Sequence, residues 1–378
     1  MWLSAFSIVV LVISMMYLLV MVAITAGWFH QDKTWLQTLQ AQKKISVVVA
    51  ARNEESTIGL LLKSIEQQRY NPLFFEVVIV DDHSTDLTFA VILYFISEHS
   101  ELNIRVIKAT GQGKKAAIKQ GISSTKANLI ITTDADCVVP PDWLQTCVDA
   151  FENKELKLLL APVIYKKTTG LFQNFFCLEF FSLVASGAGA AAINMPFMGN
   201  GANMAFTRQA YEAGITSKAY NRYTSGDDVF LIHQTVKKFG RKSVRFLLHH
   251  QMLVETPPPV SIKQFLNQRL RWASKAKGYQ SPEAIMVSLV VMLANSMLVV
   301  LFLTGFWLNW LWPVFGLLLV TKSLIDMPLV FGYADFAHRS DLKKWFIPFS
   351  FLYPFYIVMV GLTSLVFSFN WKGRHYSR

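Results

Sequence analysis

Two uncharged apolar segments, one near each end of the chain, limit most strongly what this sequence can fold into. Residues 1–31 contain no charged side chain, and an apolar helix needs roughly 20 residues to cross a bilayer. A cleaved signal peptide is the alternative, but it would begin with basic residues and have a shorter apolar core. We therefore expect residues 1–30 to form an N-terminal transmembrane anchor.

The second apolar segment lies near the C-terminus. Residues 284–321 are uncharged, with turn-forming residues at 309–313, which predicts two helices joined by a tight loop. A last uncharged run over 345–371 contains two prolines and is either another span or a re-entrant hairpin. We expect residues 283–371 to form a C-terminal transmembrane block of two to three spans.

The charged residues near these segments indicate the topology. Positive charge gathers on the cytoplasmic side of membrane spans, and lysines follow the first apolar run at positions 33, 43 and 44. We therefore expect the middle of the chain to be cytoplasmic. The basic tail after residue 371 conflicts with a single last crossing, so either the rule fails there or the last run re-enters. Lys322 and Asp326 lie one helical turn apart, either as an intramembrane ion pair or at a helix end that reaches the interface.

The middle of the chain, residues 43–260, alternates between two patterns. Runs such as 45–51 and 129–133 are rich in β-branched residues, which is typical of strands buried on both faces of a parallel sheet. Segments with helical spacing follow the strands, including one over 85–99 with Ser84 or Thr85 as its expected N-cap. Alternating strands and helices predict an α/β fold with a mostly parallel sheet. Ligands of such sheets bind at the carboxyl ends of the strands, where this sequence places Arg52, Asn53 and Glu54, then Asp81 and Asp82, then Asp134 and Asp136.

A set of short motifs in this region resembles the inverting family 2 glycosyltransferases, and more narrowly the membrane-anchored members related to cellulose and hyaluronan synthases and to ceramide glucosyltransferase. The resemblance implies a GT-A-like, Rossmann-type domain flanked by transmembrane helices. The motifs, in the order of the family, are ARNEE (51–55), VDDHSTD (80–86), GKKAAI (113–118), TDADCVVPPDWL (133–144), GNGANMAF (199–206), GDDVFL (226–231) and QRLRW (268–272).

The resemblance implies that a nucleotide-diphosphate sugar is the donor and that several of these motifs bind it. A helix N-terminus with a lysine suits a diphosphate, because backbone N–H groups and a cation face the anion there. Helix capping is the alternative role for Asn53 and for the polar residues after Asp82. The resemblance implies that the following residues contact the donor: Arg52, Asn53, Glu54, Asp81, Asp82, Lys114 and Asp134.

Asp134 and Asp136 place two carboxylates beside the expected diphosphate. Bare carboxylates would repel it, whereas Mg²⁺ or Mn²⁺ takes oxygen ligands from one or two carboxylates and from substrate phosphates. The resemblance assigns Asp136 to the metal, and Asp134 to the metal or to the donor ribose. The alternative is a pair of solvated turn acids.

Asp227 and Asp228 are the candidate catalytic pair. A hydroxyl is a poor nucleophile at neutral pH, and a positioned carboxylate can take its proton as it attacks. The family's usual triplet is Thr-Glu-Asp, so the resemblance implies that Asp228 is the base, while Gly226 and Asp227 stand in place of Thr and Glu. Two acids before a helical run are also typical of a helix N-terminus.

The resemblance places further substrate contacts outside these acids. It implies that Gly199 to Asn203 form the loop beneath the donor sugar, and that Gln268, Arg271 and Trp272 lie on one helix face at the mouth of the acceptor path. Residues 261–282 are basic and free of acids, so we also expect them to form an interfacial amphipathic helix on an anionic membrane surface. Both roles can hold at once, on different faces of the helix. Residues 172–193 are apolar but contain Glu179, so we expect an interfacial helix rather than a span.

These features together predict a metal-dependent membrane enzyme that transfers a sugar to a lipid or glycan acceptor. A processive polysaccharide synthase and a non-catalytic membrane scaffold on a transferase fold are the alternatives. A nucleotidyltransferase would have a glycine- and arginine-rich loop where this chain has ARNEE. The net charge of +11 invites a nucleic-acid partner, but no recognition motif accompanies it, so we expect no nucleic acid. Three cysteines without a C-x-x-C pair argue against a disulfide framework or a structural zinc site.

Overall fold

The computed structural model describes residues 2–31, 36, 39–217, 226–366, 369–371 and 374–376. The chain divides into two compact units. The sheet unit comprises residues 31–167 and 194–258, and the helix unit comprises residues 1–30, 168–193 and 259–378. Residues 168–193, which we expected as part of the α/β domain, therefore group with the apolar helices.

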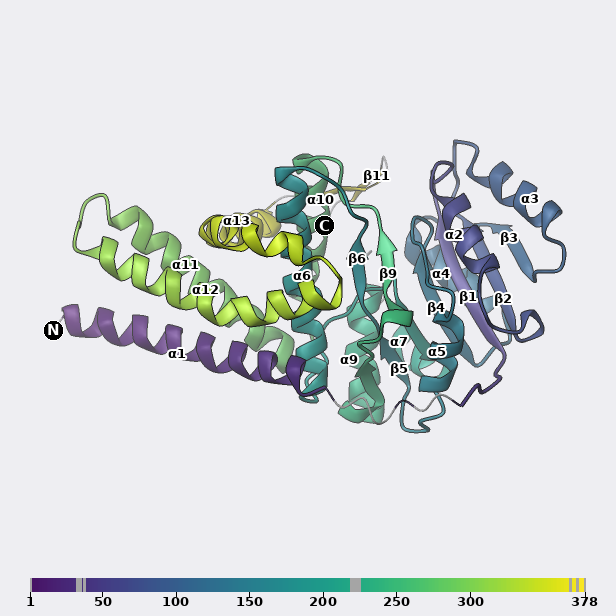
Figure 1. Ribbon diagram of the computed structural model, residues 1–378, viewed down its shortest axis with the longest axis horizontal. Helices are drawn as coiled ribbons and strands as arrows, with labels where there is room; N and C mark the ends of the chain where they lie inside the picture. Colours follow the sequence, from purple (N-terminus) through teal and green to yellow (C-terminus); the bar gives the residue numbers. More distant parts are fainter. Residues whose placement is uncertain are drawn as a thin grey trace. The chain divides into compact units, whose positions relative to one another are not determined.

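The sheet unit is built on a seven-stranded sheet with the order β3-β2-β1-β4-β7-β5-β8 (Figure 1). Neighbours among β3, β2, β1 and β4 are parallel, and β7 runs antiparallel to both β4 and β5. The predicted mostly parallel sheet is confirmed. A second, two-stranded parallel sheet pairs β6 with β9. The strands are β1 (Ile45–Ala51), β2 (Phe75–Asp81), β3 (Ile104–Lys108), β4 (Leu129–Asp134), β5 (Leu158–Leu160), β6 (Val163–Tyr165), β7 (Met204–Thr207), β8 (Val244–Phe246) and β9 (Val254–Thr256).

The helices of the sheet unit follow its strands closely. The helix predicted over 85–99 begins later, at Thr88, so the expected N-caps at Ser84 and Thr85 are wrong. The physical reason is that Ser84 and Asp86 accept hydrogen bonds from the backbone of the loop after β1, at Asn53 and Glu55. The helices are α2 (Ile58–Glu66), α3 (Thr88–Glu98), α4 (Lys114–Ser123), α5 (Trp143–Ala150), α7 (Arg208–Ile215) and α9 (Asp227–Phe239).

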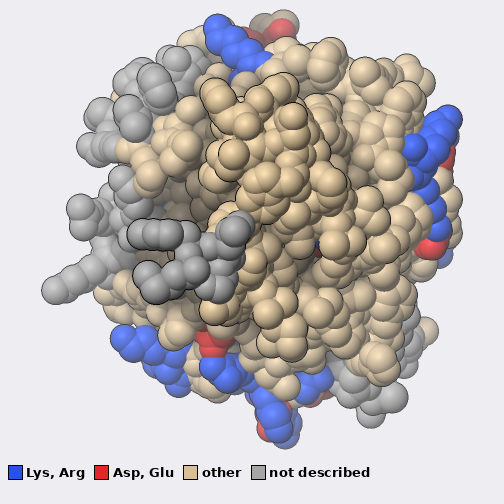
Figure 2. All heavy atoms as spheres, turned by 90° about the vertical axis from the view of Figure 1, so that its left-hand side faces the viewer, with Lys and Arg blue, Asp and Glu red and all other residues tan. Residues whose placement is uncertain are grey.

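Among the described residues of the helix unit, five helices are long and apolar enough to cross a membrane, judged by length and composition. Exposed apolar side chains cover α1, α11, α12 and α13, and Figure 2 shows a face over these helices on which charged residues lie mainly at the rim. Its helices are α1 (Trp2–Phe29), α6 (Leu171–Ala192), α10 (Ile262–Ala273), α11 (Pro282–Thr304), α12 (Leu311–Phe336) and α13 (Phe346–Val366). The short strand β10 (Phe369–Trp371) pairs antiparallel with β11 (Arg374–Tyr376).

The helices of this unit bear on three expectations. The last apolar run forms the single helix α13, which continues through Pro354, so the re-entrant hairpin is wrong. The basic segment 261–282 is not one helix, because α10 ends at Ala273 and a 3₁₀ turn follows. The helix α6 is among the candidate spans, and its interfacial placement stays a prediction.

Close packing joins α1 to α6. A Cβ atom added to Gly27 would lie 2.2 Å from the carbonyl oxygen of Gly189, and one added to Gly189 would lie 2.2 Å from that of Ile24. Real Cβ atoms do not approach backbone so closely, so both positions require glycine at this separation of the helices. Small residues that let helix backbones meet are typical of association in membranes.

A buried ion pair lies inside the helix unit. The Lys322 ammonium lies 2.7 Å from the Asp326 carboxylate, and the Tyr17 hydroxyl donates to the same carboxylate at 2.7 Å. The structure therefore has the ion pair that was one of the two alternatives for these residues. A hydroxyl from α1 completes it, which satisfies an acid whose exposure to lipid would be costly.

Candidate functional site

The first predicted site residues, at 52–54, connect the loop after β1 to the loop after β2. The Arg52 guanidinium donates to the carbonyl of Asp82 at 2.8 Å. Asn53 has a positive φ of 51°, which allows its side chain to accept from the backbone N–H of Thr85 at 2.9 Å. The backbone N–H of Glu54 donates to the Thr88 hydroxyl at 2.7 Å. The motif at 52–54 thus holds the loop after β2 in place.

Asp81 and Asp82 lie at the end of β2 in different surroundings. Asp82 is 1% exposed, and its carboxylate accepts from the backbone N–H of Gly113 at 3.1 Å, which ties it to the start of α4. Asp81 is 5% exposed. One of its oxygens accepts from the Ser84 N–H at 3.3 Å, whereas its Oδ1 is buried without a hydrogen-bond partner in the described part of the chain. Asp81 therefore has an oxygen that a ligand N–H or O–H can satisfy.

Lys114 and Asp134 form an ion pair across the sheet edge. Lys114 is the first residue of α4, and Asp134 is the last residue of β4. Their side chains are 33% and 34% exposed, so both remain within reach of a ligand. Asp136 follows two residues later and accepts from the Thr256 hydroxyl at 3.5 Å.

The acids Asp134 and Asp136 suit a hard divalent cation. Mg²⁺ and Mn²⁺ favour oxygen ligands and complete their coordination with substrate phosphates and water, so two carboxylates are enough protein ligands. Within the described residues, no group of three His, Cys, Asp or Glu side chains lies close enough to hold a metal by itself. Burial and the two neighbouring acids raise the pKa of the Cys137 thiol well above the ordinary 9.0.

Asp227 and Asp228 open helix α9, after Gly226 with a φ of 100°. Asp228 accepts from the N–H of Val229 at 2.8 Å, so the positive end of the helix dipole stabilises its ionised form. The Lys115 ammonium lies 3.7 Å from the Asp227 carboxylate. Burial lowers the pKa of Lys115 from 10.5, while Asp227 acts in the opposite direction.

Lys115 is the residue of this site that sequence reasoning missed. It follows Lys114 directly, so consecutive residues of α4 reach the acid at the end of β4 and the acid at the start of α9. The motifs GKKAAI, DAD and GDD therefore meet at one place in the sheet unit. The second lysine of GKK was the available signal, but its partner is more than a hundred residues away in the chain.

The loop over 199–203 lies beside this acid pair. A Cβ atom on Gly201 would be 3.7 Å from the Cβ of Asp228. Asn203 is buried, and its amide accepts from the Trp143 indole N–H at 3.0 Å and donates to two carbonyls at 2.8 and 2.5 Å. A Cβ on Gly199 would be 2.5 Å from the Leu160 side chain. The side chain of Asn203 thus ties the loop to the interior of the unit, which differs from the sugar contact that we expected.

Gln268, Arg271 and Trp272 belong to the helix unit. All three lie on α10, as predicted, at helical spacing. The same helix carries Arg269, one of the basic residues of the segment 261–282. Arg269 is 3% exposed and ion-paired with Glu179 of α6, so its charge is not available to an anionic membrane surface.

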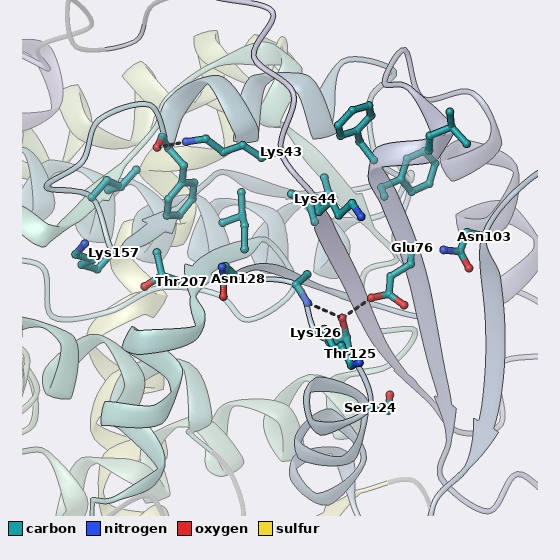
Figure 3. A pocket seen from close by; sticks show the side chains of 18 of the residues that line it. Lys43, Lys44, Glu76, Asn103, Ser124, Thr125, Lys126, Asn128, Lys157 and Thr207 are labelled. Carbon is teal, nitrogen blue, oxygen red and sulfur yellow. Dashed lines mark hydrogen bonds between the residues drawn. The ribbon is translucent and has the colours of Figure 1, made fainter.

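A cavity of about 980 Å³ lies at the opposite edge of the sheet (Figure 3). Its lining includes the first residues of β1, β2 and β4, whereas the acids described above follow the last residues of the strands. Glu76 in this lining accepts hydrogen bonds from the hydroxyls of Ser46 and Thr125. The cavity is therefore separate from the candidate site.

Family models match most of the chain. A model described as glycosyl transferase family 2 matches residues 46–184, and one described as glycosyl transferase family group 2 matches residues 129–367. The second match covers more than half of the chain. With the parallel sheet and the acids at its carboxyl edge, it shows that the chain belongs to glycosyltransferase family 2, as the motifs indicated.

Individual relatives match shorter segments. The chain is 35% identical over 114 residues to the beta-monoglucosyldiacylglycerol synthase of Nostoc sp., covering 30% of this chain and 24% of that protein. It is 32% identical over 151 residues to the 4,4'-diaponeurosporenoate glycosyltransferase of Staphylococcus aureus, covering 39% and 38% of the two chains. The matched segments thus span well under half of these relatives.

A solved structure matches nearly the whole chain. A mannosyltransferase from Pyrobaculum calidifontis, in complex with GDP-Man and Mn²⁺, aligns with a TM-score of 0.55 at 17% identity, covering 93% of this chain and 99% of that one. At this identity the match shows a shared fold. The expected GT-A-like arrangement is therefore confirmed.

Proposed function

We propose that this protein is a membrane-bound inverting glycosyltransferase that moves one sugar from a nucleotide-diphosphate sugar to a hydroxyl of a lipid or lipid-linked glycan. The observation that carries the proposal is the contact of the consecutive Lys114 and Lys115 with Asp134 and Asp227. This contact gathers the donor-side and acceptor-side acids at one edge of the sheet, where α/β proteins bind their ligands.

The donor binds along the loops after β1, β2 and β3 in this proposal. The unpartnered oxygen of Asp81 accepts a hydrogen bond from the nucleoside. Arg52, Asn53, Glu54 and Asp82 act mainly by holding these loops. The N-terminus of α4 and the ammonium of Lys114 face the diphosphate, because backbone N–H groups and a cation together favour phosphate oxygens.

A divalent cation, Mg²⁺ or Mn²⁺, fits this site. We propose that Asp136 holds it and that Asp134 either shares it or contacts the ribose. When bound, the cation neutralises the charge that develops on the departing diphosphate. The Pyrobaculum structure, which holds Mn²⁺ with a GDP-sugar, supports a divalent cation in this fold.

Asp228 is the proposed catalytic base. Its carboxylate takes the proton of the acceptor hydroxyl as the oxygen attacks the anomeric carbon, while the bond from that carbon to the diphosphate breaks. This single displacement inverts the anomeric configuration. The helix N-terminus keeps Asp228 ionised and ready to accept the proton, and Lys115 holds Asp227 beside it.

The acceptor that we propose is a lipid at the cytoplasmic face of the membrane. Five candidate spans and relatives whose names include glucosyldiacylglycerol and prenyl-phosphate sugar transfer support it. We propose that Gln268, Arg271 and Trp272 on α10 contact the diphosphate and the acceptor, since a guanidinium suits phosphate and an indole suits a sugar or lipid face.

The release of nucleoside diphosphate tests the proposal. The full chain is purified in detergent and supplied with Mn²⁺ or Mg²⁺, total membrane lipid and a panel of UDP- and GDP-sugars. We expect release from one donor, a decrease of about 10²–10⁴-fold in Asp228→Asn and a loss in Asp136→Ala. Glu101→Gln, which neutralises an exposed acid, is the matched control and keeps full activity.

The labelled product then decides the class of acceptor. A product with the mobility of a glycolipid supports single transfer, whereas a polymer supports the processive alternative. If no donor releases diphosphate and calorimetry detects no donor binding, the enzymatic proposal is wrong. A membrane scaffold on a transferase fold would then be the better account.

A further inference from the structure

Arg269 occupies an unusual place on α10. It is one of the most buried charged residues of the chain, at 3% exposed, although the helix around it is rich in charged and polar side chains. Its guanidinium carbon lies 4.5 Å from the ring centroid of Phe265 and 4.3 Å from that of Trp272. The guanidinium is therefore stacked between two aromatic rings of its own helix, an arrangement that favours arginine over lysine.

Three residues of α10 are predicted to bind substrate, and Arg269 contacts two of them, Gln268 and Trp272. Besides stacking on Trp272, it donates a hydrogen bond from Nη1 to the Oε1 of Gln268 at 2.5 Å. The amide and the indole are therefore both oriented by the same buried cation. Any rotation of the guanidinium would change the positions of both side chains.

Glu179 of α6 holds that cation. Its carboxylate accepts from the Arg269 Nε at 2.8 and 2.9 Å and also from Nη2, and it is ion-paired with the guanidinium at 2% exposure. The hydroxyl of Tyr356 on α13 donates to the same carboxylate at 3.0 Å. A forked contact of this kind restricts the plane of the guanidinium, and Tyr356 adds a third helix to the restraint.

We infer that Glu179 is a positioning residue for the transfer reaction: through Arg269 it sets the orientation of Gln268 and Trp272 on α10. The inference rests on the proposed function, because it supposes that the side chains of α10 that the ion pair orients bind substrate. Glu179 does not touch the reacting atoms. Misplacement of substrate-binding groups by about 1 Å can cost about 100-fold in rate, so the orientation of this pair matters to turnover.

A purely structural role is the competing explanation, since a buried acid that loses its partner destabilises the fold. The second buried pair of the helix unit, Lys322 with Asp326, provides a matched control. It lies within the same unit, it is accompanied by a tyrosine hydroxyl in the same way, and it is formed by α12 and α1 without α10. Asp326→Asn should therefore reproduce the structural cost alone.

The experiment compares Glu179→Gln, Arg269→Lys and Asp326→Asn in the full chain in detergent. Glu179→Gln removes the charge of the acid and keeps its shape. Arg269→Lys keeps the charge balance, so that the protein folds, but a lysine cannot make the forked contact. For each variant, kcat and the donor KM are measured on folded protein, together with the thermal unfolding midpoint.

We expect Glu179→Gln and Arg269→Lys to lower kcat by about 10- to 100-fold, as loss of orienting partners does elsewhere. The donor KM should change by less than about threefold, because most of the proposed donor contacts belong to the sheet unit and the guanidinium of Arg271, the proposed phosphate contact on α10, is unchanged. We expect Asp326→Asn to lower the unfolding midpoint while its kcat stays within about threefold of the wild type.

The inference is overturned if Arg269→Lys and Glu179→Gln keep the wild-type kcat, or if Asp326→Asn loses kcat to the same extent. If Glu179→Gln fails to fold, Arg269→Lys decides the matter alone. A wild-type chain that transfers no sugar contradicts the proposed function, and the inference then fails with it. Activity in the wild type with no effect in these variants contradicts the inference only.

Discussion

The sheet unit and the helix unit both bring basic residues against acids, but at different depths. In the sheet unit, Lys114 and Asp134 are each about a third exposed. In the helix unit, Glu179 and Arg269 are almost completely buried and bound on several sides. In a partly exposed ion pair, either residue can bind a ligand in place of its partner at a small cost in free energy. In a fully buried pair this is costly, because the ion that loses its partner stays buried without compensation. Depth therefore separates the charges available to substrate from those that hold helices together.

The strongest way to test this difference is to remove the cation from each pair. We expect Arg269→Ala to destabilise the protein by about 3–5 kcal/mol, because it leaves Glu179 charged and buried. We expect Lys114→Ala to cost about 0–1 kcal/mol, because Asp134 remains open to water. Chemical or thermal unfolding of the full chain in detergent measures both values. Equal losses of stability in the two variants would remove the distinction between the units.

The contact of α1 with α6 provides the next largest effect. Gly189→Val should destabilise the helix unit by about 1–3 kcal/mol, near the upper end of that range. The added Cβ meets the backbone of α1, and no side-chain rotamer relieves that overlap. Gly316→Val is the matched control within α12, where an added Cβ meets nothing within 4 Å. Unfolding midpoints of the two variants are compared, and a midpoint that falls equally in both would contradict the close approach of the helices.

A substitution of Asn203 tests whether neutral hydrogen bonds stabilise the interior of the sheet unit, as buried ion pairs stabilise the helix unit. Asn203→Ala removes the amide partner of the Trp143 indole N–H and of the Met252 carbonyl, while the Pro162 carbonyl keeps its bond from the Val254 N–H. We therefore expect a loss of about 1–2 kcal/mol. The exposed Asn128 serves as the control for the same substitution. An Asn203→Ala variant with normal stability and reduced donor affinity would instead favour the sugar contact that the motif predicted.

The smallest effect concerns pH and the edge of the sheet opposite the acids. Burial acts to raise the pKa of Glu76, but the hydroxyls of Ser46 and Thr125 and the guanidinium of Arg105 lower it below the ordinary 4.5. A lowered carboxyl pKa stabilises the fold above the unfolded value, and this stabilisation is lost as the pH falls through the folded value. The unfolding free energy should therefore decrease below pH 4.5, and less so in Glu76→Gln.

The control for this measurement is Glu101→Gln, because Glu101 is 65% exposed and lies apart from that network. Its dependence on pH should match that of the wild type. If Glu76→Gln and the wild type lose stability in parallel as the pH falls, the hydroxyls around Glu76 do not stabilise its charge.

Much of the fold could be predicted from local sequence patterns, and the errors of that prediction have identifiable causes. The strand at 45–51 was predicted at its observed bounds, because a continuous β-branched run has few other stable structures. The start of α3 was misplaced, because Ser84 and Asp86 bond to another loop rather than to the helix that follows them. The short strands β5 to β9 were not predicted, since a run of three or four residues does not distinguish a strand from a loop.

The sequence by itself determined the class of this protein: long apolar helices around an α/β domain of family 2 glycosyltransferases, with acids after the strands. It did so because helix length, strand burial and motif order are properties of neighbouring residues. Only the tertiary structure decided that Lys115 reaches Asp227, that Asn203 points inward and that Arg269 is buried against Glu179. Each of these contacts joins residues far apart in the chain, and whether a charge meets a partner or water depends on packing that no local pattern encodes.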